Sequence, residues 1–384
     1  MGADEIRTLI SAAGGGVADV EAAITAIGAN TAAELAMAEL KPRLRLADVS
    51  EFDSDIVVRL RLGFGSGGSV EHVLVVKPGA TGWWLGAGAD TGAPAAAVVS
   101  QELAEFVHAV FAPGAVRAAT RSVTWRDADD FSTFHAPGPA FTVVQRLLDA
   151  LDHRERPGLN SLAVRYGSDK WGLHNYTPHY EAHFAPLRDL AITVLEIGVG
   201  GFHDPSAGGA SLRMWRDYFP RAMVYGLDIV DKRLLNEGRI QVLCGDQSDG
   251  DSLRAVLEQT GPPDIVIDDA SHISKHVITT FSLLFPHLRP GGLYAIEDLQ
   301  TSYWPSFGGN DLAMSDPGTT MGLLKDLVDG LNHQELTGRS PRTPRATDRQ
   351  ISGIHFYHNL AVIEKGANDE PGAPSWLART PPER

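Results

Sequence analysis

The second half of the chain alternates short apolar runs with longer amphipathic segments. The apolar runs are rich in Val, Ile and Leu, which is typical of strands that are buried on both faces of a sheet. Strands and helices that alternate in this way predict an α/β fold, with a parallel sheet and helices on both of its faces. The predicted strands cover residues 192–198, 223–228, 240–243, 264–268 and 292–297, with a closing pair at 351–357 and 360–363, and the predicted helices cover residues 141–151, 212–218, 252–259, 277–288 and 320–336.

The first part of the chain has a different pattern. Residues 1–40 are rich in Ala, Glu and Ile and are expected to be helical. Residues 56–62 and 70–76 alternate apolar and polar side chains as strands do, and the glycines within 63–68 are typical of a hairpin turn. A further helix is expected from about residue 95 to 111. These elements predict a small α+β domain.

The pattern divides the chain into three parts. An N-terminal α+β accessory domain covers residues 1–135, a catalytic domain covers 140–365, and a proline-rich tail covers 366–384. A polar, proline-containing linker is expected at 127–139. The accessory domain carries no cluster of catalytic residue types, so we expect it to serve in subunit contacts or in closing over a substrate.

Composition excludes several classes of protein. The 384 residues carry a net charge of −15, which argues against a general nucleic-acid binder because such proteins have basic patches. No apolar run approaches the length of about 20 residues that a membrane-spanning helix needs, and no signal peptide is visible. A cytoplasmic protein with no membrane partner is therefore expected. Cys244 lies in an apolar stretch and is expected to be a buried structural thiol.

Two acidic clusters follow predicted strands. Asp268 and Asp269 end one strand, and Glu297 and Asp298 end the next. Because the carboxyl ends of neighbouring parallel strands meet at one crevice, we expect these carboxylates to converge where such sheets bind ligands. Oxygen donors alone suit Mg²⁺ better than zinc. The expected ligands are Asp269, Glu297 and Asp298. Strand alternation should point Asp268 away from Asp269, so its expected task is to orient a ligand or the substrate.

A glycine-rich turn follows the first predicted strand of the sheet. It contains Glu196, Gly198 and Gly200, and glycine lets a backbone approach a ligand closely. Asp228 ends the second strand, where an acid can accept both hydroxyls of a ribose, and Asp246 ends the third, where an acid can receive an adenine amino group. The turn lacks a complete G-x-G-x-x-G pattern. This set suits a nucleoside without phosphates.

The turn with its two acids resembles the cofactor-binding region of class I S-adenosyl-L-methionine-dependent methyltransferases. The segments 268–272 and 296–298, with 303–305 after them, resemble the metal-dependent sugar O-methyltransferases of macrolide antibiotic pathways, the mycinamicin and tylosin type. The resemblance covers roughly residues 140–365 and, more loosely, the preceding domain. It implies a Rossmann-like methyltransferase sheet, bound S-adenosyl-L-methionine and Mg²⁺, a homo-oligomer such as a tetramer, and methyl transfer to a hydroxyl of a deoxysugar on a polyketide.

A polar and aromatic segment precedes the first strand of the sheet. Lys170 is expected to meet the carboxylate of the methionine part of the cofactor, and Tyr176 and Tyr180 to line the path of the methyl group. The alternative is that this segment holds only a helix cap and surface aromatics.

His272 is the candidate general base. Its unperturbed pKa of about 6.5 suits a proton acceptor at neutral pH, and it lies three residues beyond the expected ligand Asp269. The alternative is that His272 only caps the helix expected to begin near Ser274.

Two other functions remain open. One is an NAD-dependent sugar oxidoreductase or epimerase on a similar sheet, which would bind nicotinamide and need no metal. The other is a non-catalytic binding subunit that keeps a methyltransferase-like sheet. The missing third glycine counts against the first, and the intact acidic clusters with His272 count against the second.

Overall fold

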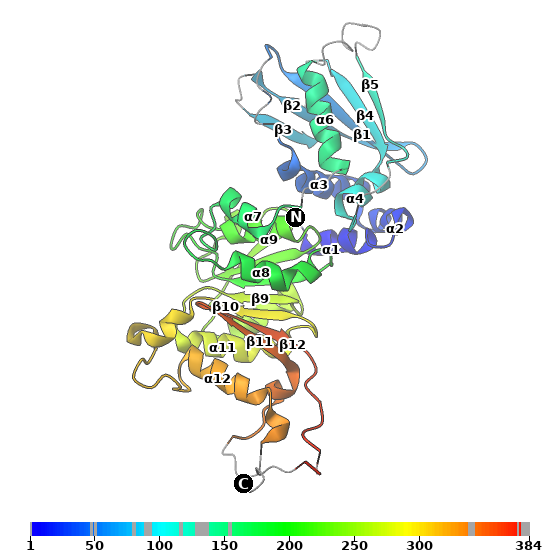
Figure 1. Cartoon of the computed structure of the whole chain (residues 1–384). Coiled ribbons are helices and arrows are strands. Elements are labelled where there is room, and N and C mark those ends of the chain that lie inside the picture. The colour runs from blue at the N-terminus through cyan, green and yellow to red at the C-terminus, as the bar shows by residue number, and fades with distance from the viewer. Residues whose placement is uncertain are drawn as a thin grey trace.

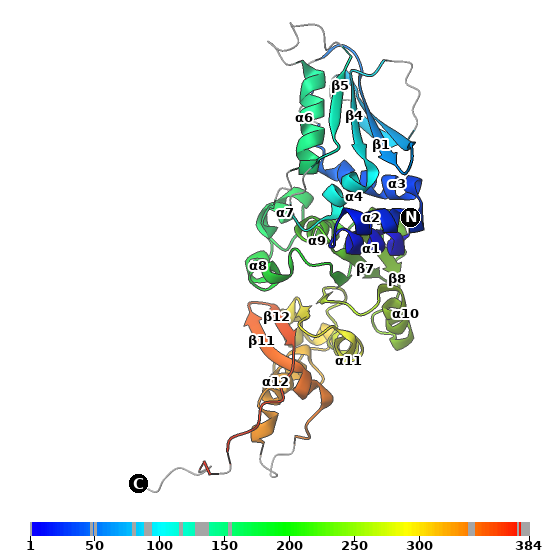
Figure 2. The same cartoon turned by 90° about the vertical axis from the view of Figure 1, so that its right-hand side faces the viewer.

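A computed structural model shows an elongated molecule with a smaller sheet at one end and a larger sheet below it (Figures 1 and 2). Helices from the start of the chain lie between the two sheets. The structure describes residues 2–46, 49, 52–78, 82–87, 94–114, 118–126, 138–152, 156–336, 342–374 and 376–377.

The smaller sheet has the strand order β3-β2-β1-β4-β5. The predicted hairpin is confirmed, since the first two strands pair in antiparallel fashion through the glycine-containing turn. The strands are β1 (Ile56–Phe64), β2 (Gly68–Val76), β3 (Trp83–Ala87), β4 (Ala97–Glu102) and β5 (Ser122–Trp125).

The helix predicted from about residue 95 to 111 is wrong in its first half. Residues 97–102 form β4, which pairs in parallel with β1, and only α4 (Leu103–Phe111) is helical. Alternate residues of β4 are buried, including Ala97 and Val99. The alanine-rich sequence around residue 95 favours a helix, but a half-buried pleated surface with valines favours the sheet.

The predicted helices of residues 1–40 are confirmed as α1 (Ala3–Ala12), α2 (Val17–Ile27) and α3 (Ala29–Leu40). Helix α1 packs on the larger sheet and its helices. The guanidinium of Arg7 donates to the carbonyl oxygen of Thr260 at 2.6 Å, and that of Arg221 donates to Ile10 at 2.9 Å. Helix α3 contacts β2 and β3 of the smaller sheet, so the N-terminal helices pack on both sheets.

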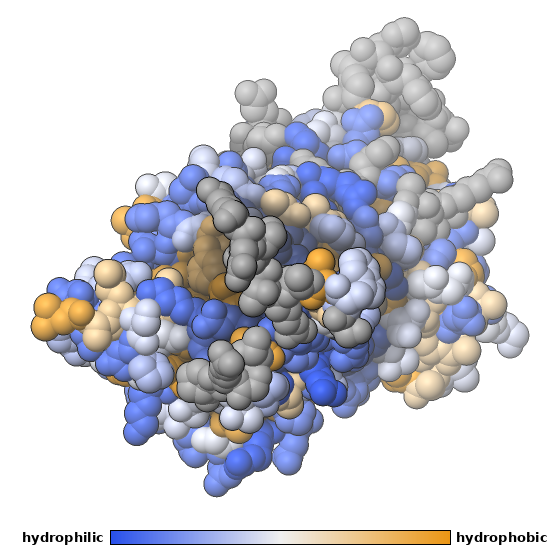
Figure 3. Space-filling view, turned by 60° about the horizontal axis from the view of Figure 1, so that its bottom comes forward, coloured by the Kyte–Doolittle hydropathy of each residue, from blue (hydrophilic) through white to orange (hydrophobic). Residues whose placement is uncertain are grey.

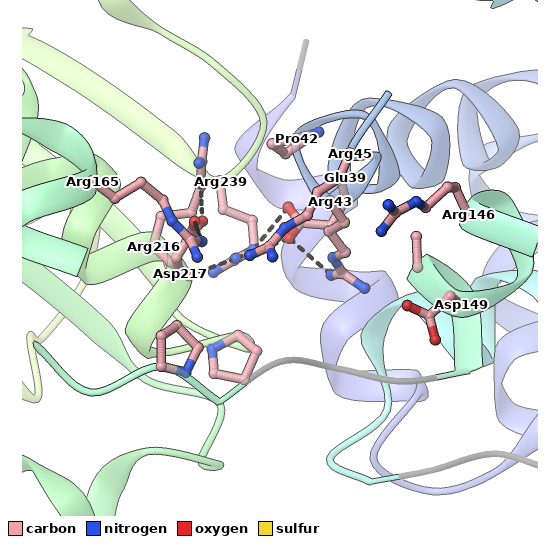
Figure 4. Close-up of a pocket in the computed structure, with 13 residues that line it drawn as sticks. Glu39, Pro42, Arg43, Arg45, Arg146, Asp149, Arg165, Arg216, Asp217 and Arg239 are labelled. Carbon is pink, nitrogen blue, oxygen red and sulfur yellow. Dashed lines mark hydrogen bonds and ion pairs between the residues drawn. The ribbon is translucent and has the colours of Figure 1, made fainter. Parts of the chain in front are cut away.

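A buried ion pair joins α3 to the larger sheet (Figure 4). Glu39 accepts from the Nε of Arg239 at 3.0 Å and from its Nη2 at 2.9 Å, and Arg43 donates to the same carboxylate at 2.9 Å. The Arg239 guanidinium also donates to backbone carbonyls of the larger domain. Burial raises the pKa of Glu39, but Arg239 and Arg43 outweigh it and lower that pKa to about 2.

Helix α6 (Pro139–Asp152) confirms the helix predicted at 141–151, yet it lies along the smaller sheet, where it contacts β1 and α4 (Figure 1). The packing therefore places the boundary between the two domains after α6, one helix later than the boundary expected at residue 140. Most of the linker predicted at 127–139 lies outside the described residues, which resume at 138.

The larger sheet has the strand order β11-β12-β10-β9-β6-β7-β8. The strands from β10 to β8 run parallel, and β12 pairs in antiparallel fashion with β10 and β11. All the predicted strands of this region are confirmed, which confirms the α/β fold. They are β6 (Thr193–Ile197), β7 (Met223–Asp228), β8 (Ile240–Cys244), β9 (Ile265–Asp268), β10 (Leu293–Ile296), β11 (Ile351–Tyr357) and β12 (Leu360–Lys365).

Helices cover both faces of this sheet. One core contains Val194, Tyr180 and Trp215, and the other contains Leu195 and Phe281, as strand alternation requires. The first face is covered by α7 (Leu159–Tyr166), α8 (Thr177–Phe184) and α9 (Ala210–Tyr218), and the second by α10 (Gly250–Thr260), α11 (Ser274–Leu284) and α12 (Thr320–Gly330) together with α1.

Two surface features complete the fold. Cys244 is exposed at the end of the edge strand β8, so the prediction of a buried thiol is wrong. Figure 3 shows one face on which hydrophilic residues predominate and hydrophobic ones are scattered among them. Among the described residues, no helix has both the length and the apolar character needed to cross a membrane.

Candidate active site

A cavity of about 900 Å³ opens at the carboxyl ends of the parallel strands, where the turns after β6 to β10 meet. Open α/β sheets bind ligands at this edge. The predicted site residues that line it are Gly198, Gly200, Asp228, Asp246, Asp269, His272 and Asp298. The predicted site residues outside its lining are Lys170, Tyr176, Glu196, Asp268 and Glu297.

The glycine turn after β6 touches the turn that carries the acidic cluster. Gly198 has φ +94°, and a Cβ there would lie 2.2 Å from the carbonyl oxygen of Asp269. A side chain at this position would therefore have to displace the acidic turn. The cofactor turn and the acidic turn are held in direct backbone contact because residue 198 is glycine.

The acids after β7 and β8 bind local backbone and face the cavity. Asp228 accepts from the backbone N–H of Val199 at 3.1 Å and of Val230 at 2.9 Å. Asp246 accepts from the N–H of Ser248 at 2.7 Å, and this hydrogen bond lowers the pKa of its carboxyl. Both carboxylates keep lone pairs for a ligand, because each oxygen accepts more than one hydrogen bond.

Glu196 lies beneath the glycine turn. It accepts from the hydroxyl of Ser211 at 2.7 Å and from the indole N–H of Trp215 at 3.1 Å, and its side chain has no exposed surface. Burial raises the pKa of its carboxyl. The structure therefore places Glu196 as a support for the turn rather than in the lining of the cavity.

Lys170 points in a different direction from the one predicted. Its fully buried ammonium lies 2.6 Å from Asp269 and 2.7 Å from Glu297, with Glu196 at 3.2 Å. Burial lowers the pKa of Lys170, but the carboxylates outweigh it and raise that pKa well above its usual value. The lysine therefore stays charged beneath the cavity, whereas we expected it at the cofactor's methionine carboxylate.

Glu297 is a buried carboxyl with a raised pKa. Burial and the neighbouring Asp269 raise its pKa well above the usual value, although Lys170 and Tyr180 act against them. The Tyr180 hydroxyl donates to the same oxygen as Lys170, at 2.5 Å. The carboxyl oxygens of Asp269 and Glu297, with those of Asp298 beside them, are all hard oxygen donors. Such a set fits a divalent cation.

Asp298 and His272 are partly exposed members of the acidic cluster. The Nε2 of His272 lies 3.6 Å from Asp298, and the hydroxyl of Tyr176 donates to the other Asp298 oxygen at 2.8 Å. Donor atoms of Asp269, His272 and Asp298 lie within 4.8 Å of one another. Two of the three predicted ligands thus share a cluster with the predicted base, while Glu297 sits one layer below.

His272 does not cap the following helix. Helix α11 begins at Ser274, and its N-terminal flanking residue, Ile273, makes no side-chain capping bond. The backbone N–H of Ile273 donates instead to the hydroxyl of Ser271. His272 itself adopts φ +54° and lines the cavity. The alternative of a capping histidine is therefore not supported.

Asp268 points away from Asp269, as alternation predicted. It is buried, and one of its oxygens accepts from the amide of Gln247 at 3.0 Å. Gln247 in turn accepts from the backbone N–H of Ser271 at 2.9 Å. Burial raises the pKa of Asp268 to about 7. Asp268 therefore supports the acidic turn through its hydrogen bond with Gln247, and it does not line the cavity.

Sequence reasoning gave no role to two residues that the structure brings into the site. Gln247 links Asp268 to the acidic turn, and His174 lies 3.9 Å from Asp298 and stacks on Tyr176. Gln247 directly follows Asp246, and His174 belongs to the polar segment before the sheet, so both lie next to residues that the sequence analysis singled out. Their partners lie far away in sequence, which is why no local pattern showed their roles.

The sheet order, the glycine turn and the acids after the next two strands define a class I methyltransferase. Solved structures agree. MycE methyltransferase from the mycinamycin biosynthetic pathway, in complex with Mg and SAH, matches with a TM-score of 0.85 and 37% identity over 99% of this chain and 97% of that chain. A complex of MycE with Mg, SAH and mycinamycin VI matches with a TM-score of 0.84.

Sequence comparison is more specific. Residues 6–121 match the family model for the MycE methyltransferase N-terminal region. The chain is 48% identical to the 8-demethyl-8-alpha-L-rhamnosyl tetracenomycin-C 2'-O-methyltransferase of Streptomyces olivaceus, over 97% of each chain. It is 43% identical to the demethylmacrocin O-methyltransferase of Streptomyces fradiae, over 97% of this chain and 94% of the relative. The protein belongs to this family of S-adenosyl-L-methionine-dependent sugar O-methyltransferases.

Proposed function

We propose that this protein transfers a methyl group from S-adenosyl-L-methionine to a sugar hydroxyl of a natural-product glycoside of the macrolide or aromatic polyketide kind, with Mg²⁺ as its metal. The observation that carries the proposal is the contact between the glycine turn at Gly198 and the acidic turn at Asp269, which puts a nucleoside site and a cation site side by side in one cavity.

The cofactor end of the cavity suits the nucleoside part of the methyl donor. Asp228 accepts the ribose hydroxyls, and Asp246 receives the adenine amino group, while Gly198 and Gly200 let the backbone approach the ligand. The carboxylate partner of the methionine part is not Lys170, because that ammonium is already held by three carboxylates. Glu196 and Asp268 support the turns from below.

Mg²⁺ fits the acidic end, with Asp269 and Asp298 as the partly exposed ligands and Glu297 buried behind them. When bound, such an ion gathers neighbouring hydroxyls of the sugar and lowers their pKa. The protein's own part is to hold the ligands in place. Tyr176 fixes Asp298, and Lys170 fixes Asp269 and Glu297.

His272 removes the proton. The sugar hydroxyl oxygen forms a bond to the methyl carbon, the carbon–sulfur bond of the cofactor breaks, and S-adenosylhomocysteine leaves with the electron pair. The hydroxyl proton passes to the Nε2 of His272, and Asp298 at 3.6 Å stabilises the resulting imidazolium. The two ends of the cavity hold acceptor and donor close together, and this proximity favours the transfer.

A thermal-shift experiment separates the candidate functions. S-adenosylhomocysteine and Mg²⁺ are each expected to raise the melting temperature, and NAD is expected to leave it unchanged, because ligands stabilise the folded state that binds them. Turnover with S-adenosyl-L-methionine and a panel of rhamnosyl and deoxysugar glycosides then tests the transfer. Stabilisation by NAD and not by S-adenosylhomocysteine would favour the oxidoreductase, and cofactor binding without turnover on any glycoside would favour the binding subunit.

The assembly is a further part of the proposal. The family resemblance implies a homo-oligomer, and a tetramer is the expected size. Light scattering coupled to size-exclusion chromatography gives the mass of the particle in solution, and a monomer at working concentration would contradict this part alone.

A further inference from the structure

A second cluster of metal-binding residue types lies outside the cavity. His183 comes from α8, His355 from β11 and Glu364 from β12, and none of them lines the cavity. Donor atoms of the three residues lie within 4.8 Å of one another. The Nε2 of His355 lies 2.9 Å from the Oε1 of Glu364, and the Nδ1 of His183 lies 3.8 Å from the same oxygen. Three separate elements thus bring their side chains to one point.

A hydrogen bond to a neighbouring tyrosine orients the His183 ring. The Nε2 of His183 hydrogen-bonds the hydroxyl of Tyr357 at 2.9 Å, and Tyr357 is itself stacked on His179 with ring centroids 3.8 Å apart. When Nε2 carries the proton and donates it to Tyr357, the Nδ1 atom presents its lone pair to the cluster. Metal-binding histidines are commonly fixed through their second ring nitrogen in this way.

His183 is the most deeply buried side chain of the cluster. Its side chain is only 10% exposed, whereas those of His355 and Glu364 are 40% and 38% exposed. An ion from solvent can therefore reach the cluster from the side of the two strands.

We propose that His183, His355 and Glu364 form a second metal site, for a transition-metal ion of the zinc class. Two imidazoles and one carboxylate suit Zn²⁺ or Co²⁺, whereas Mg²⁺ prefers oxygen donors alone. The ion differs in chemistry from the one proposed for the cavity, so each site selects its own metal.

The placement of the cluster gives the ion a structural task. Helix α8 lies beside the β11–β12 hairpin (Figures 1 and 2). The same helix carries Tyr180, which donates to Glu297, and it is preceded by Tyr176, which donates to Asp298. An ion bound at His183 would link the C-terminal end of α8 to the hairpin. This link would fix the position of the helix and therefore of both tyrosines.

The test measures metal binding directly, in tag-free protein with Asp269→Asn and Asp298→Asn so that the cavity site is lost. Titration with Co²⁺ followed by visible absorption, and the zinc content after dialysis, are the readouts. We expect one equivalent of either metal and a cobalt spectrum with nitrogen ligation. Adding His355→Ala or Glu364→Gln is expected to abolish both signals, since two remaining ligands bind weakly.

The matched control is His358→Ala, because His358 is an exposed histidine in the turn of the same hairpin. This variant is expected to bind one equivalent of metal and to give the same cobalt spectrum as the parent protein. Melting curves without metal show whether each variant is folded. Absence of metal in the parent protein would overturn the proposal, and so would equal binding by the His355→Ala and His358→Ala variants.

Discussion

At the scale of single residues, Lys170 organises the acidic side of the site. Its ammonium holds Asp269 and Glu297, which come from turns about 100 residues further along the chain, at sequence separations of 99 and 127. The sequence identified Asp269, Asp298 and His272 as neighbours because strand ends in a parallel sheet converge. It misplaced Lys170, because no local pattern tells whether a lysine beside a glycine-rich sheet meets a ligand or a buried carboxylate.

Replacing Lys170 tests the charge balance beneath the cavity. Lys170→Met leaves the carboxylates of Glu196, Asp269 and Glu297 without their buried cation, which typically costs about 3–5 kcal/mol of stability. Mg²⁺ is expected to recover part of the loss, so the stabilisation by Mg²⁺ should be larger in the variant than in the parent protein. Urea unfolding with and without MgCl₂ measures both quantities.

Lys232→Met is the matched control, because Lys232 is also fully buried but donates to backbone carbonyls of residues 204 and 207 rather than to carboxylates. This variant should lose stability without an added response to Mg²⁺. If the two variants respond to Mg²⁺ alike, Lys170 does not balance the charge of a cation site.

Replacing His272 tests the proton acceptor. His272→Ala is expected to lower turnover by about 10²–10⁴-fold, the usual contribution of a positioned general base. Binding of S-adenosylhomocysteine, measured by calorimetry, should stay close to that of the parent protein. His287→Ala, at an exposed histidine outside the cavity lining, should change neither quantity. Turnover of the His272→Ala variant at the parent rate would rule out His272 as the base.

At the scale of elements, the strands of the larger sheet could be predicted almost completely, whereas two of its covering helices, α7 and α8, were missed. The apolar runs of the strands are continuous, since both faces are buried, and each run is flanked by turn residues. The smaller sheet was harder. Strands β3 and β5 are short and only partly buried, and β4 lies next to an alanine-rich sequence. In such segments the pairing partner, rather than the local pattern, decides the structure.

The turn after β6 offers a test by a pair of matched glycines. Gly198 and Gly200 both have positive φ, at +94° and +72°, but only at Gly198 would a Cβ clash with backbone. Gly200→Ala should therefore lower the stability only through the left-handed backbone conformation of residue 200, which costs about 1–2 kcal/mol. Gly198→Ala must in addition move the acidic turn, so it should lose more stability and should also weaken Mg²⁺ binding.

Chemical denaturation and Mg²⁺ titration by calorimetry measure the two effects. Equal loss of stability in the two alanine variants, with Mg²⁺ affinity retained in both, would show that the contact between the two turns does not couple the cofactor end to the cation end.

At the scale of the whole molecule, the ion pair of Glu39 with Arg239 connects the N-terminal helices to the larger sheet. The pKa of Glu39 is lowered from 4.5 to about 2, so the pair stabilises the fold above pH 4.5 and the contribution is lost as pH falls toward 2. A shift of this size corresponds to about 3 kcal/mol. Glu39→Gln should therefore lower stability at pH 7 by about that amount and flatten its dependence on pH in this window.

Urea unfolding of the parent protein and of Glu39→Gln at a series of pH values checks this. Glu71→Gln is the control, since Glu71 pairs with Arg59 and Arg61 at a partly exposed site and such pairs contribute about 0–1 kcal/mol. Parallel pH curves for the parent protein and Glu39→Gln would contradict the prediction.

The same connection bears on the order in which the chain is made. Residue 39 leaves the ribosome 200 positions before residue 239, with which its carboxylate pairs. Until then α1 has α2, α3 and α4 as neighbours, but the hydrogen bond from Arg7 to Thr260 in the larger domain cannot form. Domains generally fold as units during synthesis. Here the N-terminal helices can pack with the smaller sheet early, but their contacts with the larger sheet form only after its strands have been synthesised.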